Sequence, residues 1–196
     1  SQDQEIVEDV IYADSYQVAR HRPMRDWKFV IDVGANIGTF ALLVHKHAPD
    51  CKVVCVEPSP ENLEVLRANV GHFAQIVPMA MVSAAMAGEP VAFSEPAGPL
   101  RPSTGGGSLL GQHWAGKAAE EQQTYDVQTV GLKNVADGSS PVDCLKLDCE
   151  GSEYYILEPA ELAKAGVKFV AGEWHGSFRK FNDFRQANFP HYDFGD

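Results

Sequence analysis

The feature that most constrains the fold is a regular alternation of short apolar runs and amphipathic segments in the first eighty residues. Residues 29–33 and 52–56 are largely apolar, and residues 76–80 form a third such run. Short apolar runs of this kind are typical of strands buried in a parallel sheet. Helical periodicity fills the intervals, over residues 37–47 and from Ser59, where Ser, Pro and Glu form a typical helix start. The order predicts a doubly wound, mostly parallel α/β sheet with helices on both faces.

The rest of the chain extends this pattern within what we expect to be a single domain of 196 residues. Hydrophobic residues make up 44% of the sequence, which is enough to form a substantial core. Residues 142–148 and 167–172 predict two further strands, and residues 152–165 predict the helix between them.

Three segments lie outside the regular alternation. Residues 94–124 are rich in Gly, Pro, Ser, Gln and Glu, which predicts a lid or loop insertion. Residues 1–28 predict an N-terminal lead-in with a helix over residues 5–20. The tail predicts a helix that packs through phenylalanines at helical spacing, namely Phe178, Phe181 and Phe184.

The charge balance argues against two classes of partner. The chain carries 16 Lys and Arg against 27 Asp and Glu, a net charge of −11. Such a chain gains little from counterion release, so we expect neither nucleic acid nor an anionic membrane surface as partner. The sequence also has no apolar run near the ~18 residues that a membrane span requires.

The four cysteines indicate a reducing compartment. Cys51, Cys55, Cys144 and Cys149 form no C-x-x-C pair and have no histidines at zinc-site spacing. The first three lie in or beside predicted strands, where we expect them to be small core residues. The first ten residues are acidic and lack signal-peptide features, so a cytoplasmic location is expected.

The main functional signal is the segment Asp32–Thr39 (DVGANIGT), which joins a predicted strand to a predicted helix. Its glycines permit a tight turn, and the helix N-terminus offers unpaired N–H groups. Glu57 lies 19 residues after Gly38 at the tip of the next strand, where a carboxylate binds a ribose diol. These features predict a site for an adenosine-containing ligand, with contacts from Asp32, Gly34, Ala35, Asn36, Gly38, Thr39, Glu57 and Pro58.

The spacing of the glycines narrows the choice of ligand. Nicotinamide dinucleotide folds use G-x-G-x-x-G, whereas here Asn36 stands at the position of the second glycine. No Lys-Ser or Lys-Thr pair follows, which excludes a triphosphate-binding loop. The loop therefore suits a cofactor without phosphates, S-adenosyl-L-methionine.

Four segments of the sequence form a distinctive set, namely residues 30–39 (VIDVGANIGT), 56–58 (VEP), 145–153 (LKLDCEGSE) and 173–175 (EWH). In order and spacing they resemble the FkbM family of S-adenosylmethionine-dependent methyltransferases. The resemblance implies a Rossmann-like class I fold of seven strands and O-methylation of a hydroxyl on a sugar or small metabolite. Only about twenty residues follow His175, so the last strand pair is expected to be shortened or absent.

The acidic residues after the fourth predicted strand are the candidates for chemistry. Asp148 and Glu150 would attract the cationic donor or take the proton of the acceptor. His175 is a candidate general base, because an imidazole pKa is easily tuned near neutrality. For Glu153 we favour a simple contribution to the helix dipole.

Alternative interpretations remain at this stage. Glu173 and His175 lie two residues apart at the end of a predicted strand, where they would face the same way and with Asp148 would match a divalent metal site. We expect no metal. His175 is alternatively a core histidine. For the whole chain the alternatives are a nicotinamide-dependent oxidoreductase and a non-catalytic methyltransferase-like domain. No oligomeric state is predicted.

Overall fold

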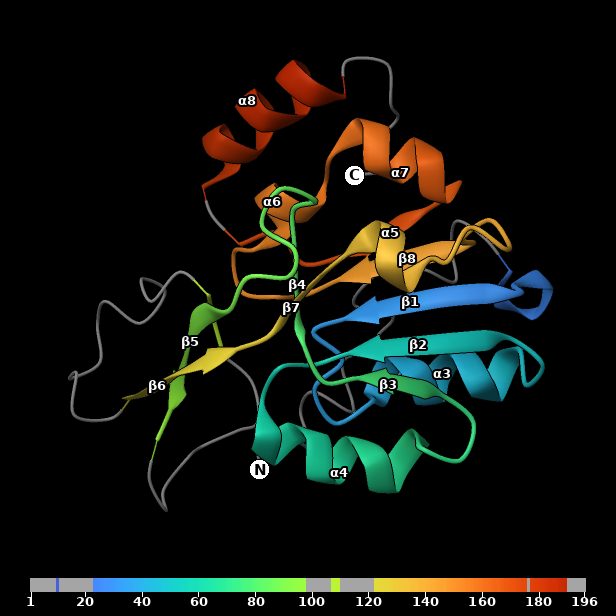
Figure 1. Cartoon of the computed structure of the whole chain (residues 1–196). Helices are drawn as coiled ribbons and strands as arrows, with labels where there is room; N and C mark the ends of the chain where they lie inside the picture. The colour runs from blue at the N-terminus through green and yellow to red at the C-terminus, as the bar shows by residue number, and fades with distance from the viewer. Residues whose placement is uncertain (1–9, 11–22, 98–106, 110–121, 176, 190–196) are drawn as a thin grey trace.

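A five-stranded parallel sheet forms the centre of the computed structural model, which describes residues 10, 23–97, 107–109, 122–175 and 177–189 (Figure 1). The strand order is β3-β2-β1-β8-β9, so the chain winds outward from β1 in both directions. This order confirms the predicted doubly wound fold. The strands are β1 (Phe29–Val33), β2 (Lys52–Val56), β3 (Gln75–Val77), β8 (Cys144–Leu147) and β9 (Val170–Gly172).

Helices cover both faces of this sheet, because successive side chains along a buried strand point to opposite sides. Val30 and Val53 belong to a core formed with α3 and α4, whereas Ile31 and Val54 belong to a core formed with α5 and α7. Within the described residues no helix is long and apolar enough to cross a bilayer. The helical elements are η1 (Met24–Asp26), α3 (Thr39–His47), α4 (Pro60–Val70), α5 (Leu132–Val135), α6 (Glu153–Ile156), α7 (Pro159–Ala165) and α8 (Phe178–Asn188).

Two small strand pairs lie outside the main sheet. β4 (Ala80–Val82) pairs in parallel with β7 (Thr129–Gly131), and β5 (Val91–Pro96) pairs antiparallel with β6 (Gln122–Val127). The β5–β6 hairpin lies beyond the carboxyl ends of β1 and β2 (Figure 1). It therefore borders the edge of the sheet at which ligands bind in folds of this kind.

Proline and glycine explain where the predicted elements were wrong. The single strand predicted over residues 76–80 is two strands, because Pro78 has no N–H for a ladder. The single helix predicted over residues 152–165 is two helices, and Pro159 begins the second of them. Helix α3 begins at Thr39, two residues later than predicted, because its N-cap Gly38 adopts a left-handed φ of 91°.

Other expectations concern the cysteines and the less regular segments. All four thiols are free, and Cys51, Cys55 and Cys144 are buried, which confirms that they are core residues. The lead-in helix lies outside the described residues except for Val10, which is buried. Most of the predicted lid over residues 94–124 also lies outside them.

Asp143 joins the amino ends of three elements. Its carboxylate accepts hydrogen bonds from the backbone N–H groups of Lys28 at 2.7 Å and Phe29 at 3.1 Å, and from Lys168 Nζ at 2.6 Å. Burial acts to raise the pKa of this carboxyl, but the Lys168 ammonium and the two N–H groups outweigh burial and lower it. Asp143 therefore stabilises the fold as an anion.

We predict that Asp143→Asn lowers the unfolding free energy by about 1–3 kcal/mol at pH 7. Because the folded pKa lies below the unfolded value, this stabilisation is present above about pH 4 and is lost as the pH falls through the folded pKa. Urea unfolding at several pH values should show the difference from wild type shrinking in acid. The exposed Asp126→Asn is the matched control. A difference that stays constant down to pH 2 would contradict this account.

Candidate functional site

A cavity of about 260 Å³ lies at the carboxyl ends of β1, β2 and β8. Its wall combines the loop after β1, the tip of β2, the loop after β8 and part of the β5–β6 hairpin. Asp32, Gly38 and His175 do not line it. The predicted site residues that do are Gly34, Ala35, Asn36, Thr39, Glu57, Pro58, Asp148 and Glu150.

The loop after β1 is held against both neighbouring strands. The N–H groups of Gly34 and Ala35 donate to Val56 O at 3.0 and 3.2 Å. Gly34 has a φ of 69°, and a Cβ placed on it would lie only 1.9 Å from the carbonyl oxygen of Asp148. Only glycine allows this approach without displacing the loop after β8. The loop that lines the cavity at the end of β1 thus depends on contact with the loop that lines its acidic side.

Glu57 is a buried carboxylate at the tip of β2, and its side chain is only 3% exposed. Oε2 accepts from Asn36 N–H at 2.8 Å, and Oε1 accepts from Ser59 N–H at 3.0 Å and Asn62 Nδ2 at 3.2 Å. Burial raises the pKa of Glu57, while these hydrogen bonds oppose the shift. The carboxylate is therefore fixed in place by backbone and side-chain donors at the wall of the cavity.

Asp32 forms a buried ion pair with Lys146 instead of lining the cavity. Lys146 Nζ lies 3.1 Å from Asp32 Oδ1 and donates to Gly34 O at 2.8 Å. Burial raises the pKa of Asp32, and the Lys146 ammonium opposes the shift. The sequence interpretation assigned Asp32 to the cofactor and did not single out Lys146, which does line the cavity. The signal was available, because Lys146 is a charged residue within an apolar run of a buried strand.

His175 lies among four carboxylates. Its Nδ1 is 3.0 Å from Glu153 Oε1, and its Nε2 is 3.4 Å from Glu150, 3.6 Å from Glu173 and 3.9 Å from Asp148. Burial acts to lower the pKa of His175, but the Glu153 hydrogen bond and the charges of Glu150, Glu153 and Asp148 outweigh it and raise the pKa to about 9.

These contacts bear on two of the sequence interpretations. A pKa raised to about 9 favours the protonated imidazole at neutral pH, which disfavours His175 as the expected general base. Glu153 does more than complement a helix dipole, because its side chain is 1% exposed and bonded to His175. The core-histidine alternative also does not match, since His175 is only half-buried and ion-paired.

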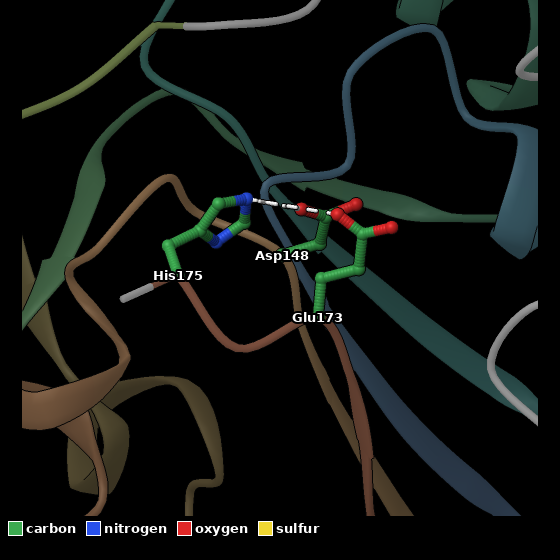
Figure 2. Close-up of side chains that lie close together, drawn as sticks. All are labelled: Asp148, Glu173 and His175. Atoms are coloured by element: carbon green, nitrogen blue, oxygen red, sulfur yellow. Dashed lines mark ion pairs between the residues drawn. The ribbon is translucent and has the colours of Figure 1, made fainter. Parts of the chain in front are cut away.

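Asp148, Glu173 and His175 come together as the sequence suggested (Figure 2). One ligand atom from each lies within 4.8 Å of the others. Glu173 and His175 follow β9 instead of ending it, since that strand stops at Gly172. This set of two carboxylates and an imidazole suits a divalent cation, but a metal and a proton compete for the same Nε2. That the protein works without a metal stays a prediction.

The loop after β8 also touches the segment that the sequence predicted as a lid. Ser108 exchanges two backbone hydrogen bonds with Ser94, and its Oγ donates to Glu150 O at 2.9 Å. Glu150 has a φ of 54°, which is unusual for a residue other than glycine. The described part of the segment is therefore fastened to the backbone of a candidate catalytic residue.

Comparison with known proteins agrees with this geometry. The model of the methyltransferase FkbM domain matches residues 32–194. The chain belongs to the FkbM methyltransferase domain family. This confirms the resemblance stated above on four short segments.

The FkbM domain is also similar to individual proteins. It is 29% identical over 160 residues to the methyltransferase sdnD of Sordaria araneosa, covering 66% of this chain and 59% of that protein. Solved structures that the chain matches include the precorrin-6y C5,15-methyltransferase of Geobacter metallireducens, with 13% identity and a TM-score of 0.43, covering 83% of this chain and 63% of that chain. The N-terminal domain of human METTL16 has 10% identity and a TM-score of 0.41, covering 93% and 58%.

The tail of the FkbM domain packs beside the acidic loops. The Trp174 ring lies 4.7 Å from Phe181 and 5.3 Å from Phe184, between ring centroids, and Trp174 Nε1 donates to Tyr154 OH at 2.5 Å. Phe181 and Phe184 are therefore packing residues, as predicted. The side chain of Phe178 lies outside the described ones. Through Trp174, which directly precedes His175, this cluster joins α8 to α6.

We predict that Gly34→Ala lowers the unfolding free energy by about 2–5 kcal/mol, because it adds both backbone strain and a clash with Asp148 O. The matched control is Gly138→Ala. Gly138 has a φ of 70°, and nothing lies within 4 Å of a Cβ there. This control should cost only the backbone strain, about 1–2 kcal/mol. Equal losses for the two variants in chemical unfolding would show that contact between the loops does not matter.

Proposed function

We propose that this FkbM domain transfers the methyl group of S-adenosyl-L-methionine to a hydroxyl oxygen of a sugar or other small metabolite. The observation that carries the proposal is the buried Glu57 carboxylate at the wall of a cavity whose opposite side is acidic. Family membership supports methyl transfer, and the sequence resemblance supports a hydroxyl acceptor.

The residues at the cavity fit the proposed cofactor. A carboxylate accepts about four hydrogen bonds, and described residues donate three to Glu57. The carboxylate can therefore accept a further hydrogen bond from a ribose hydroxyl. Asp148 and Glu150 place negative charge at the wall of the cavity. This charge would attract the positively charged sulfonium and amino groups of S-adenosylmethionine. Bound in this cavity, S-adenosylmethionine would supply an electrophilic methyl group. The residues that would hold it are Gly34, Ala35, Asn36, Thr39, Glu57 and Pro58, with Asp32 and Gly38 acting indirectly.

The chain's own contribution to the reaction is alignment and removal of a proton. Alignment of an acceptor hydroxyl with the methyl carbon accounts for much of the acceleration in reactions of this kind. Glu150 or Asp148 would take the proton of that hydroxyl, since both carboxylates line the cavity. Nε2 of His175 would lie beside both carboxylates, at 3.4 Å from Glu150 and 3.9 Å from Asp148.

Isothermal titration calorimetry with S-adenosylhomocysteine tests the proposal directly. We expect binding to the folded chain, and no heat at high micromolar ligand would contradict the proposal. A parallel titration with NADH tests the oxidoreductase alternative. Incubation with S-adenosylmethionine and a panel of hydroxylated sugars and small metabolites, followed by mass spectrometry, tests turnover. Binding without any product would favour the non-catalytic alternative.

We predict that Glu57→Ala weakens S-adenosylhomocysteine binding by about 1–3 kcal/mol, or roughly 5- to 150-fold, because a buried acceptor is lost. Calorimetry measures the change, and circular dichroism checks that the variant is folded. Glu57→Gln serves if the alanine variant does not fold. Glu64→Ala, an exposed position on α4, should bind as the wild type does. Wild-type affinity in both Glu57 variants would refute a cofactor role for this carboxylate.

We predict that Glu150→Gln lowers turnover of any acceptor found in the panel by roughly 10²- to 10⁴-fold, the range that general bases supply. Affinity for S-adenosylhomocysteine should stay within about twofold of wild type. The exposed Glu89→Gln is the control. Unchanged turnover in Glu150→Gln would contradict Glu150 as the general base and would leave Asp148 as the candidate.

A further inference from the structure

Glu153 is a buried acidic residue whose contacts converge on one oxygen. It is the first residue of α6, and its side chain is only 1% exposed. Oε1 accepts from Cys149 N–H at 3.0 Å and Gly151 N–H at 3.3 Å, and it lies 3.0 Å from His175 Nδ1. Because a buried carboxylate is costly unless it is bonded, these contacts explain how Glu153 is tolerated in the interior.

Two of these bonds hold the backbone on either side of Glu150. Cys149 and Gly151 flank that residue directly. The Gly151 N–H belongs to the peptide unit that follows Glu150, and the Cys149 N–H belongs to the peptide unit that precedes Cys149, so the two bonds hold the chain just before and just after Glu150. A left-handed backbone is unfavourable for a residue other than glycine, and Glu150 has a φ of 54°. The bond from Ser108 Oγ to Glu150 O is a further tie. The unusual conformation of Glu150 is therefore held by contacts outside its own side chain.

The third contact sets the direction of the His175 ring. Nδ1 and Nε2 lie on opposite edges of an imidazole ring. A hydrogen bond at one nitrogen therefore fixes the direction in which the other nitrogen points. With Nδ1 at Glu153, Nε2 faces Glu150 Oε2 at 3.4 Å, with Glu173 and Asp148 slightly farther away. Oε1 of Glu153 thus orients His175. The same oxygen also holds the loop that carries Glu150, the carboxylate that faces Nε2 of His175.

We infer that Glu153 is a positioning residue of the methyl-transfer site, since its Oε1 holds the imidazole of His175 and the backbone of Glu150 in one arrangement. The inference rests on the proposed function. It goes beyond that function because it assigns a role to a residue that does not line the cavity. Loss of Glu153 releases the ring and the loop together.

A spectroscopic test needs no acceptor. In protein labelled with ¹⁵N-histidine, we expect a slowly exchanging Nδ1 proton on His175, assigned by its loss in His175→Gln. Glu153→Ala should abolish this signal, and Glu153→Gln, which keeps an acceptor oxygen, should retain it at a shifted position. Glu161→Gln is the control, because Glu161 is also buried but pairs with Lys164 on α7. A signal unchanged in both Glu153 variants overturns the inference.

A kinetic test separates positioning from a merely structural role. Using an acceptor found in the panel, Glu153→Gln should lower kcat roughly 10- to 100-fold, with S-adenosylhomocysteine affinity within about twofold of wild type. Combined with Glu150→Gln, it should cause little further loss, because residues that act as a unit are not additive. Additive losses would refute the inference.

The two tests also separate this inference from the proposed function. If the wild type binds no S-adenosylhomocysteine, the proposed function fails, while the histidine spectrum still decides whether Glu153 orients the ring of His175. If the wild type binds and turns over but the spectrum does not respond to Glu153, only the positioning role fails.

Discussion

A buried ion pair between neighbouring central strands is the interaction on which the site depends. Asp32 of β1 and Lys146 of β8 are direct partners in the parallel register, and both are almost fully buried. Breaking such a pair leaves an unpaired charge in the interior, which is strongly destabilising. Lys146 also binds Gly34 O, so the pair ties the start of the glycine loop to the strand that carries the acidic loop. The two halves of the cavity meet at this point.

The two halves have different chemical characters. The half at β1 and β2 combines the glycine loop and apolar side chains with one fixed carboxylate, Glu57, which suits a neutral nucleoside. The half at β8 and β9 gathers Asp148, Glu150 and Glu173 around the imidazolium of His175. In a sheet that winds in both directions from a central strand, a crevice forms at the carboxyl ends of the strands where the winding direction changes. Both halves of the cavity therefore arise from the main sheet and its loops.

Much of the fold and part of the site could be predicted from short-range pattern. Apolar runs identified the strands of the main sheet because such runs are buried wherever the sheet is covered on both faces. The glycine loop and Glu57 were predicted because their spacing reflects local geometry. The prediction missed the end of a strand at Pro78 and the start of a new helix at Pro159. Both were detectable, because proline interrupts strands and helices.

The sequence by itself determined the doubly wound sheet, the glycine loop and the set of acidic residues, because periodicity and local spacing specify these. Only the tertiary structure decided which partner each charge takes. Asp32 pairs with Lys146 over 100 residues away in the chain, and Glu153 bonds to His175 from another element. Those pairings, and the protonated state of His175 that follows from them, depend on burial and distance in three dimensions, which no linear spacing encodes.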